Sequence, residues 1–266
     1  MKLLYLMLLL ASPALAVEEE HPYFSPEEVQ ALEPERCKGM VEIPAGSFTF
    51  GDSYAAAGRR TPPAFKHLIK PVTTKTIGAF LMDKCEVTQL QQEAVWLMGR
   101  GKPGEKLDLK RPNGDHPMFG ARKEFAELFC KYLGKRLPTE EEWEKAARGG
   151  TSTVYYWGDD YRDANTYEQS PRQYNMSVPT GPVAEKAPNP YGLYDMLGNV
   201  PEMTSGECWK GGSMMLYSEY YASVGRCAKA PEKGWAHSYG WRCVRDIVKP
   251  VEGDGKQSQA QGEEAR

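Results

Sequence analysis

The chain has 266 residues, of which 33 are Lys or Arg and 36 are Asp or Glu, and its formal net charge is −3. With 41% hydrophobic and 26% charged residues it can bury a core, and its near-neutral charge argues against nucleic-acid binding, which needs a basic surface. No apolar run reaches the roughly 20 residues of a membrane-spanning helix.

The first 16 residues predict a secretory signal peptide. Residues 1–2 are a short basic start, residues 3–10 are apolar, and Ala14 and Ala16 form a small-residue cleavage site. The mature chain would begin at Val17, be secreted or periplasmic, and have no transmembrane segment. An uncleaved membrane anchor is the alternative.

The rest of the chain is predicted to contain one compact domain between two polar ends. Residues 17–36 are an acidic lead-in with one helical turn, and residues 37–248 form the domain. Residues 249–266 have too little apolar surface to offset the entropy of ordering, so we expect a disordered tail.

Capping residues, glycines that end helices, and apolar residues at three- and four-residue steps predict three helices, over residues 88–98, 121–133 and 139–149. The first and third each begin with a capping box, Thr88 with Gln91 and Thr139 with Glu142. Short strands are predicted at 40–43, 47–50, 77–82, 154–156 and 241–246. Helices and strands do not alternate regularly, so the pattern indicates a loop-rich α+β fold rather than a doubly wound sheet.

All six cysteines lie in the mature part of the chain. An even number of cysteines in an oxidising compartment predicts disulfides. No C-x-x-C pair is present, so neither a zinc ribbon nor a thioredoxin-like site is supported. Spacing alone leaves about 15 pairings open.

Eight phrases occur in chain order: MVEIPAGSF at 40–48, MDKCEVT at 82–88, HP at 116–117, GKRLPTEEEWEKAARGG at 134–150, YWG at 156–158, NPYGLYDMLGNV at 189–200, KGGS at 210–213 and GWRC at 240–243. Together they resemble the formylglycine-generating enzyme (sulfatase-modifying factor) family over residues 40–246. The resemblance implies a single irregular α+β domain related to the C-type lectin fold, with bound calcium.

The positions that carry the activity of this family differ here. Active members hold copper on two cysteines, the third and eighth residues after the serine of the Gly-Gly-Ser phrase. The matching residues are Leu216 and Tyr221, which offer no thiolate. The two tryptophans of a Gly-Asn-x-Trp-Glu-Trp phrase are replaced by Pro201 and Met203. Copper and formylglycine generation are therefore not expected.

Iron is not expected either. A related branch of the fold uses a histidine triad, whereas this chain has four histidines and no H-x-x-x-H spacing.

The calcium ligands of the family are retained in part. The resemblance assigns one site to the side chains of Asp195 and Glu202 and the carbonyls of Gly198 and Val200. Calcium prefers such a mixture of carboxylate and carbonyl oxygens. A second site would begin at Asn165 with the carbonyl of Thr166, but no acidic partner is evident in the downstream segment 173–177.

The resemblance also pairs Cys130 with Cys243. Cys227 matches a bonded position whose usual partner position is Ala147 here, so Cys208 is the nearest candidate partner. Cys37 and Cys85 then remain for each other.

These observations predict an exported, calcium-binding pseudoenzyme that binds a peptide or protein partner or serves as an envelope accessory protein. The former substrate groove would be lined around Trp143, Ser213, Leu216, Tyr217, Tyr221 and Arg226. Trp143, on its helix, is also expected in the core. The alternative is a metal-dependent oxidoreductase that acts on a protein cysteine or a small sulfur compound through a displaced metal site.

Overall fold

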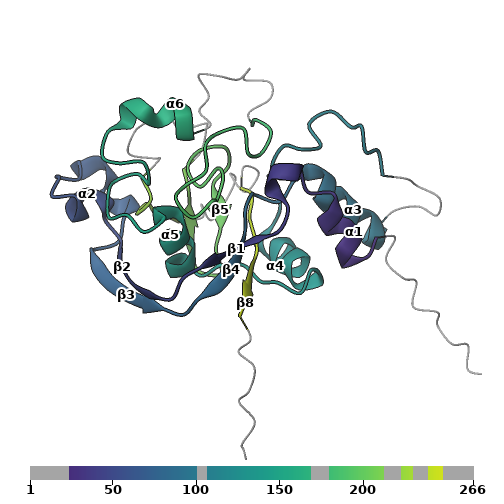
Figure 1. Ribbon diagram of the computed structural model, residues 1–266, viewed down its shortest axis with the longest axis horizontal. Coiled ribbons are helices and arrows are strands. Elements are labelled where there is room, and N and C mark those ends of the chain that lie inside the picture. Colours follow the sequence, from purple (N-terminus) through teal and green to yellow (C-terminus); the bar gives the residue numbers. More distant parts are fainter. Residues whose placement is uncertain (1–23, 101–106, 169–179, 213–222, 230–238, 248–266) are drawn as a thin grey trace, which may run out of the picture.

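The fold is seen in a computed structural model that describes residues 24–100, 107–168, 180–212, 223–229 and 239–247 (Figure 1). The helices in these ranges are α1 (Pro26–Ala31), α2 (Ser53–Ala56), α3 (Gln89–Arg100), α4 (Lys123–Tyr132), α5 (Glu140–Arg148) and α6 (Ala164–Tyr167). The strands are β1 (Met40–Ile43), β2 (Gly46–Phe50), β3 (Thr73–Ile77), β4 (Phe80–Asp83), β5 (Glu202–Met203), β6 (Cys208–Lys210), β7 (Ala228–Lys229) and β8 (Val244–Asp246). No helix in these ranges is long and apolar enough to span a membrane.

Three small antiparallel sheets form the framework. In one sheet β4 lies between β1 and β8, so the beginning and the end of the domain are hydrogen-bonded to the same strand. β2 pairs with β3, and β6 lies between β5 and β7. Figure 1 shows α5 near the middle of the molecule, with β2 and β3 toward one end and α1, α3 and α4 toward the other. The α+β, loop-rich, single-domain prediction is confirmed.

Helix α5 is positioned by both of its ends. Thr139 and Glu142 form the predicted capping box, with Glu142 N donating to Thr139 Oγ1 and Thr139 N to the Glu142 carboxylate. Gly149 ends the helix at φ 59°, and a Cβ there would lie 2.6 Å from Pro190 Cδ, so glycine is required. The helix buries Trp143, Ala146 and Ala147 against the strands and the 193–197 loop.

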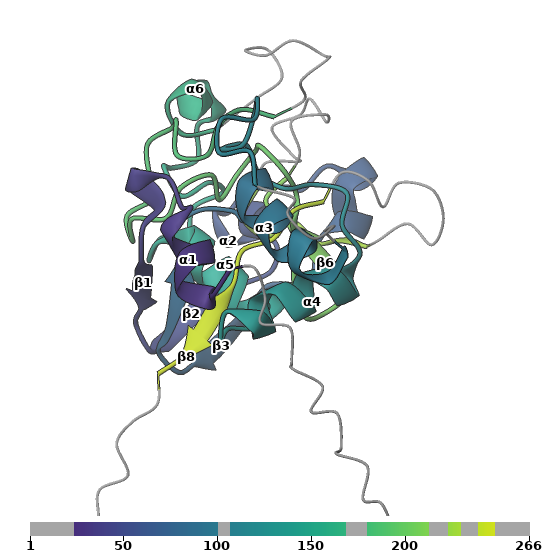
Figure 2. The same ribbon diagram turned by 90° about the vertical axis from the view of Figure 1, so that its right-hand side faces the viewer.

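A second part of the core surrounds α4. Phe129 and Phe125 pack edge-on against the ring of Trp241, with centroids 5.5 Å and 6.1 Å away. Helix α1 lies beside α3 (Figure 2) and buries Val29 completely in this cluster. Residues 24–36 therefore pack on the domain, and α1 is the helical turn expected there.

The local predictions succeed to different degrees. The 40–43 strand is β1, the helices begin within two residues of their predicted starts, and the Thr88–Gln91 capping box forms. Residues 154–156, however, are a loop with one bridge between Tyr155 and Gly158. Val154 N donates to the side chain of Asp159 instead of to a neighbouring strand.

All six cysteines are in disulfides, and the three predicted pairs are confirmed. Cys37 is bonded to Cys85, Cys130 to Cys243, and Cys208 to Cys227. The Cys130–Cys243 bond joins α4 to the segment that leads into β8 and closes a separation of 113 residues.

Candidate metal centre

The loop between Asp195 and Val200 is tightly turned and buried. Asp195, Gly198 and Asn199 all have positive φ, at 54°, 92° and 49°, which is uncommon for residues other than glycine. Gly198 N donates to Gly211 O at 2.8 Å, which fixes the loop against the end of β6. A backbone held in this sparsely populated conformation is typical of a functional loop.

Three carboxylates meet in this region, and each is at most 2% exposed. Asp195 and Glu202 are the predicted residues, and Glu86 joins them from the segment after β4. Asp195 Oδ2 accepts from Ala184 N at 2.7 Å. Glu86 accepts from Asn199 Nδ2 at 3.1 Å and from Val200 N at 3.4 Å. Glu86 therefore holds the loop in place through hydrogen bonds to Asn199 and Val200.

Sequence reasoning missed Glu86, although it belongs to the MDKCEVT phrase. Its pKa is raised well above the ordinary value by burial and by the charges of Asp195 and Glu202. Asp195 and Glu202 lie in one loop, but Glu86 is more than 100 residues earlier in the chain, so spacing could not reveal that it shares their environment.

One guanidinium faces the three carboxylates. Arg242 Nη2 lies 2.6 Å from Glu202 Oε1, and its Nε lies 2.8 Å from Oε2. Trp143 Nε1 also donates to Glu202 Oε2 at 2.8 Å. Arg242 continues to the carbonyls of Lys84 and Tyr194, so it ties the loop to the strand edge after β4.

The remaining oxygens suit a hard cation. In the described part of the chain, no donor is hydrogen-bonded to the carbonyls of Gly198 and Val200. Within the same residues, no three His, Cys, Asp or Glu side chains are arranged as a ready ligand set. A cation would thus combine the Asp195 carboxylate with backbone carbonyls, as calcium does. Glu202 would contribute while remaining paired with Arg242.

The residues of the predicted second calcium site already have protein partners. The carbonyl of Asn165 accepts from Lys186 Nζ at 3.0 Å, and that of Thr166 accepts from Ala187 N at 3.0 Å. The segment 173–177 lies outside the described residues. Nearby Glu168 is buried, which raises its pKa to about 7.

Two of the predicted groove residues can be located. The ring of Trp143 is fully buried and bonded to Glu202, so it packs in the core as expected from its helix and presents no surface to a groove. Arg226 is also buried, and its backbone forms an antiparallel β-bridge with that of Ile69. Ser213, Leu216, Tyr217 and Tyr221 lie outside the described residues.

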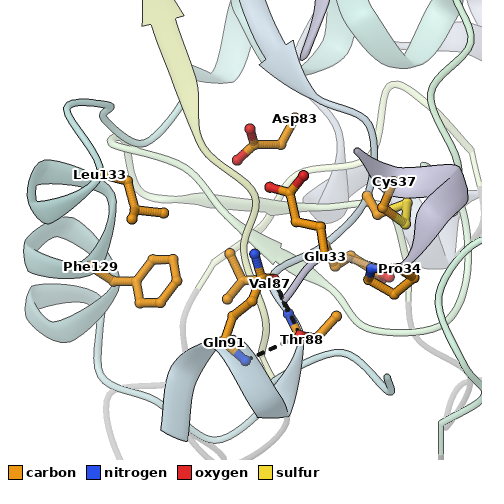
Figure 3. Close-up of a pocket in the computed structure, with 11 residues that line it drawn as sticks. Glu33, Pro34, Cys37, Asp83, Val87, Thr88, Gln91, Phe129 and Leu133 are labelled. Atoms are coloured by element: carbon orange, nitrogen blue, oxygen red, sulfur yellow. Dashed lines mark hydrogen bonds between the residues drawn. A yellow bond between two sulfur atoms is a disulfide. The ribbon is translucent and has the colours of Figure 1, made fainter. Parts of the chain in front are cut away.

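Glu86 also lines a small cavity of about 10 Å³, which Figure 3 shows with its labelled residues. Its volume suits a single water molecule. Figure 3 shows the carboxylates of Glu33 and Asp83 side by side near the Cys37 disulfide. Lys135 Nζ lies 2.7 Å from Asp83 Oδ1, and burial together with the charge of Asp83 raises the pKa of Glu33 to about 7.

The mixed helix-and-sheet fold with its three disulfides is that of a domain of the formylglycine-generating type. The model of the sulfatase-modifying factor enzyme 1-like domain matches residues 25–247, and the chain belongs to this family.

Relatives of this chain include enzymes and a protein named as inactive. It is 27% identical to the formylglycine-generating enzyme of Thermomonospora curvata, with 85% of this chain and 97% of that protein covered. It is 30% identical to the inactive C-alpha-formylglycine-generating enzyme 2 of Bos taurus, with 63% and 70% covered.

Two solved structures share the fold. PvdO from Pseudomonas aeruginosa has a TM-score of 0.61 at 22% identity, with 80% of this chain and 96% of that chain covered. Variable protein 1 of Treponema denticola has a TM-score of 0.60 at 21% identity, with 78% and 95% covered.

Proposed function

We propose that this protein is an exported, non-catalytic member of its family that binds calcium at the Asp195–Glu202 loop and a peptide or protein partner through the former substrate groove. The observation that carries the non-catalytic part is the state of the cysteines. All six are in disulfides, so no thiolate remains to bind Cu(I).

Two further observations support this part of the proposal. Leu216 and Tyr221 stand where the resemblance expects the copper ligands. A relative of similar identity is named as inactive. The proposed partner rests on the family resemblance, and the proposed export rests on the signal peptide predicted at residues 1–16. If the protein is exported, N-terminal sequencing should find Val17 as the first residue.

The catalytic question is decided by one assay. The purified protein is incubated with copper, oxygen and a cysteine-containing peptide, and aldehyde is measured by mass spectrometry. The enzyme from Thermomonospora curvata serves as the positive control. We expect no aldehyde from this protein. Metal-dependent aldehyde formation would favour the oxidoreductase alternative.

The calcium part of the proposal rests on the charge balance of the loop. Asp195, Glu202 and Glu86 place three buried acids against the single guanidinium of Arg242. A divalent cation would offset the excess negative charge and use the two carbonyls that no described donor occupies. Its chemistry here is structural, because it would cross-link the loop in its tight conformation.

Calcium removal tests this part of the proposal separately. Saturation at about 100 times Kd stabilises a protein by roughly 2.7 kcal/mol, so EDTA should lower the Tm and calcium should restore it. Asp195→Asn should weaken calcium binding at least tenfold, whereas exposed Asp115→Asn should not. An EDTA response that is zero in the wild type, with no calcium found by elemental analysis, would refute the site.

A further inference from the structure

A second cavity, of about 190 Å³, lies between β2 and the C-terminal end of α5. Its lining includes the aromatic residues Phe48 and Tyr191, the hydroxyl residues Ser47 and Thr151, and the basic residues Lys145 and Arg148. This cavity shares no lining residue with the one in Figure 3. It is large enough for a small molecule.

Lys145 is the unusual group in this wall. The residue is only 4% exposed, and its ammonium donates to the carbonyl of Gly46 at 2.8 Å. The centroid of the Phe48 ring lies 5.9 Å from Nζ, at the outer limit of a cation–π contact, which is weaker than pairing with a counter-ion. Burial lowers the pKa of Lys145. One hydrogen bond leaves two of its three N–H donors for another acceptor.

The acids that could neutralise Lys145 have other partners. In the part of the chain that the structure describes, no carboxylate lies within ion-pair distance of its ammonium. On the same helix, Glu141 pairs with Lys75 at 3.5 Å. Glu144 is shared between Arg148 and Lys210, at 2.8 Å and 2.7 Å.

The neighbourhood therefore has an excess of positive charge. Lys145 and Arg148 are each at most 4% exposed, and Glu144, the carboxylate that pairs with Arg148, is shared with the buried Lys210. Burying an unpaired cation is costly unless an anion or dipole compensates it. Lys145 thus offers an anion at the cavity wall a positive charge and two hydrogen-bond donors.

We propose that this cavity binds a small oxyanion, either a free carboxylate, sulfate or phosphate or the anionic end of a compact organic acid. The oxyanion would accept from the two remaining N–H groups of the Lys145 ammonium. The Arg148 guanidinium would add only its charge, because it already bonds Glu144 and the Gly51 carbonyl. The rings of Phe48 and Tyr191 would pack against an attached organic group. This site is independent of the calcium loop and of the proposed partner.

The test is titration with sodium sulfate, phosphate and acetate, each against sodium chloride at equal ionic strength, followed by calorimetry and Tm. Sulfate and phosphate also stabilise proteins through exclusion from the surface, so the comparison between variants decides. Lys145→Met should weaken oxyanion binding at least tenfold, whereas Lys131→Met, at an exposed position on α4, should leave it unchanged. Equal responses in wild type and both variants would overturn the proposal.

A second measurement uses the unmodified protein. Crystals soaked in selenate should show an anomalous peak next to Lys145 Nζ. Difference density for acetate at this position, without bound selenate, would indicate a preference for a planar carboxylate. No peak and no saturable binding of any of the three anions would refute the site. If Lys145→Met does not fold, Lys145→Gln removes the charge and keeps a polar side chain.

Discussion

The buried charges of this protein are unbalanced in opposite directions in two regions that share α5. Around the Asp195–Glu202 loop, three carboxylates face the guanidinium of Arg242. Near the cavity at the end of α5, Arg148 and Lys210 share the carboxylate of Glu144, and Lys145 pairs with no carboxylate of the described residues. Adjacent residues of one helix contact the two regions, since Trp143 donates to Glu202 and Glu144 binds Lys210.

The comparison shows what each imbalance selects. An excess of buried acids with open carbonyls suits a hard cation, whereas an excess of buried ammonium and guanidinium groups suits an oxyanion. Each region keeps one internal counter-charge, so the domain can fold before a ligand arrives. The ligand would then offset the remaining charge.

The largest effect is expected from Arg242→Met. Removal of one partner from a buried ion pair costs about 3–5 kcal/mol, because the remaining charge has no compensation. Three acids would remain here, so the loss of unfolding free energy should lie at the upper end, and saturating calcium should reduce it. Urea denaturation with and without calcium measures this effect. Exposed Arg245→Met is the matched control, and an equal loss in both variants would contradict the charge argument.

Glu144→Gln breaks the other region. It removes the carboxylate from Arg148 and Lys210 and weakens the bond from Gly51 N, which should also cost about 3–5 kcal/mol. The residual amide still accepts from Gly51 N, so we expect a smaller loss than with Arg242→Met. Sulfate should partly restore stability here and calcium should not. The opposite pattern of rescue would mean that the two regions do not differ as described.

These charge arguments could not be derived from the sequence alone. Capping boxes predicted α3 and α5 because their residues are three positions apart, and the family phrases supplied the disulfides. Glu86 and Asn199, in contrast, are 113 residues apart and meet only in the folded chain. The unbroken run of four polar residues at the start of β3 gave no signal that this segment would pair with β2. Local chemistry was predictable, whereas the balance of buried charge depends on long-range contacts.

One disulfide lies next to each region, so the stability contributed by the two disulfides can also be compared. Cys130–Cys243 closes 113 residues next to Arg242, and Cys208–Cys227 closes 19 residues next to Lys210. From loop-closure entropy, losing the first should cost about 4.8 kcal/mol and losing the second about 3.2 kcal/mol. Denaturation of the two paired Cys→Ala variants measures the difference. A larger loss for the short loop would show that native packing outweighs chain entropy.

The smallest expected effect is a dependence of the unfolding free energy on pH, which arises from buried acids. The pKa of Glu33 is raised from 4.5 to about 7, first by burial and then by the charge of Asp83. Between these values the folded state binds more protons than the unfolded state, so stability falls as pH rises from 4.5 to 7. Glu168, also with a pKa of about 7, acts in the same direction.

Glu33→Gln should flatten this slope by a few degrees of Tm, since about 1 kcal/mol corresponds to 2–4 °C in a domain of this size. The measurement is thermal unfolding at pH 5 and at pH 8, with exposed Glu27→Gln on α1 as the control. An unchanged slope would show that the proton is not on Glu33. We expect it there because Asp83 has Lys135 as its counter-ion, whereas Glu33 accepts a hydrogen bond from Gly39 N. The acid without its own cation is therefore the one that should hold the proton.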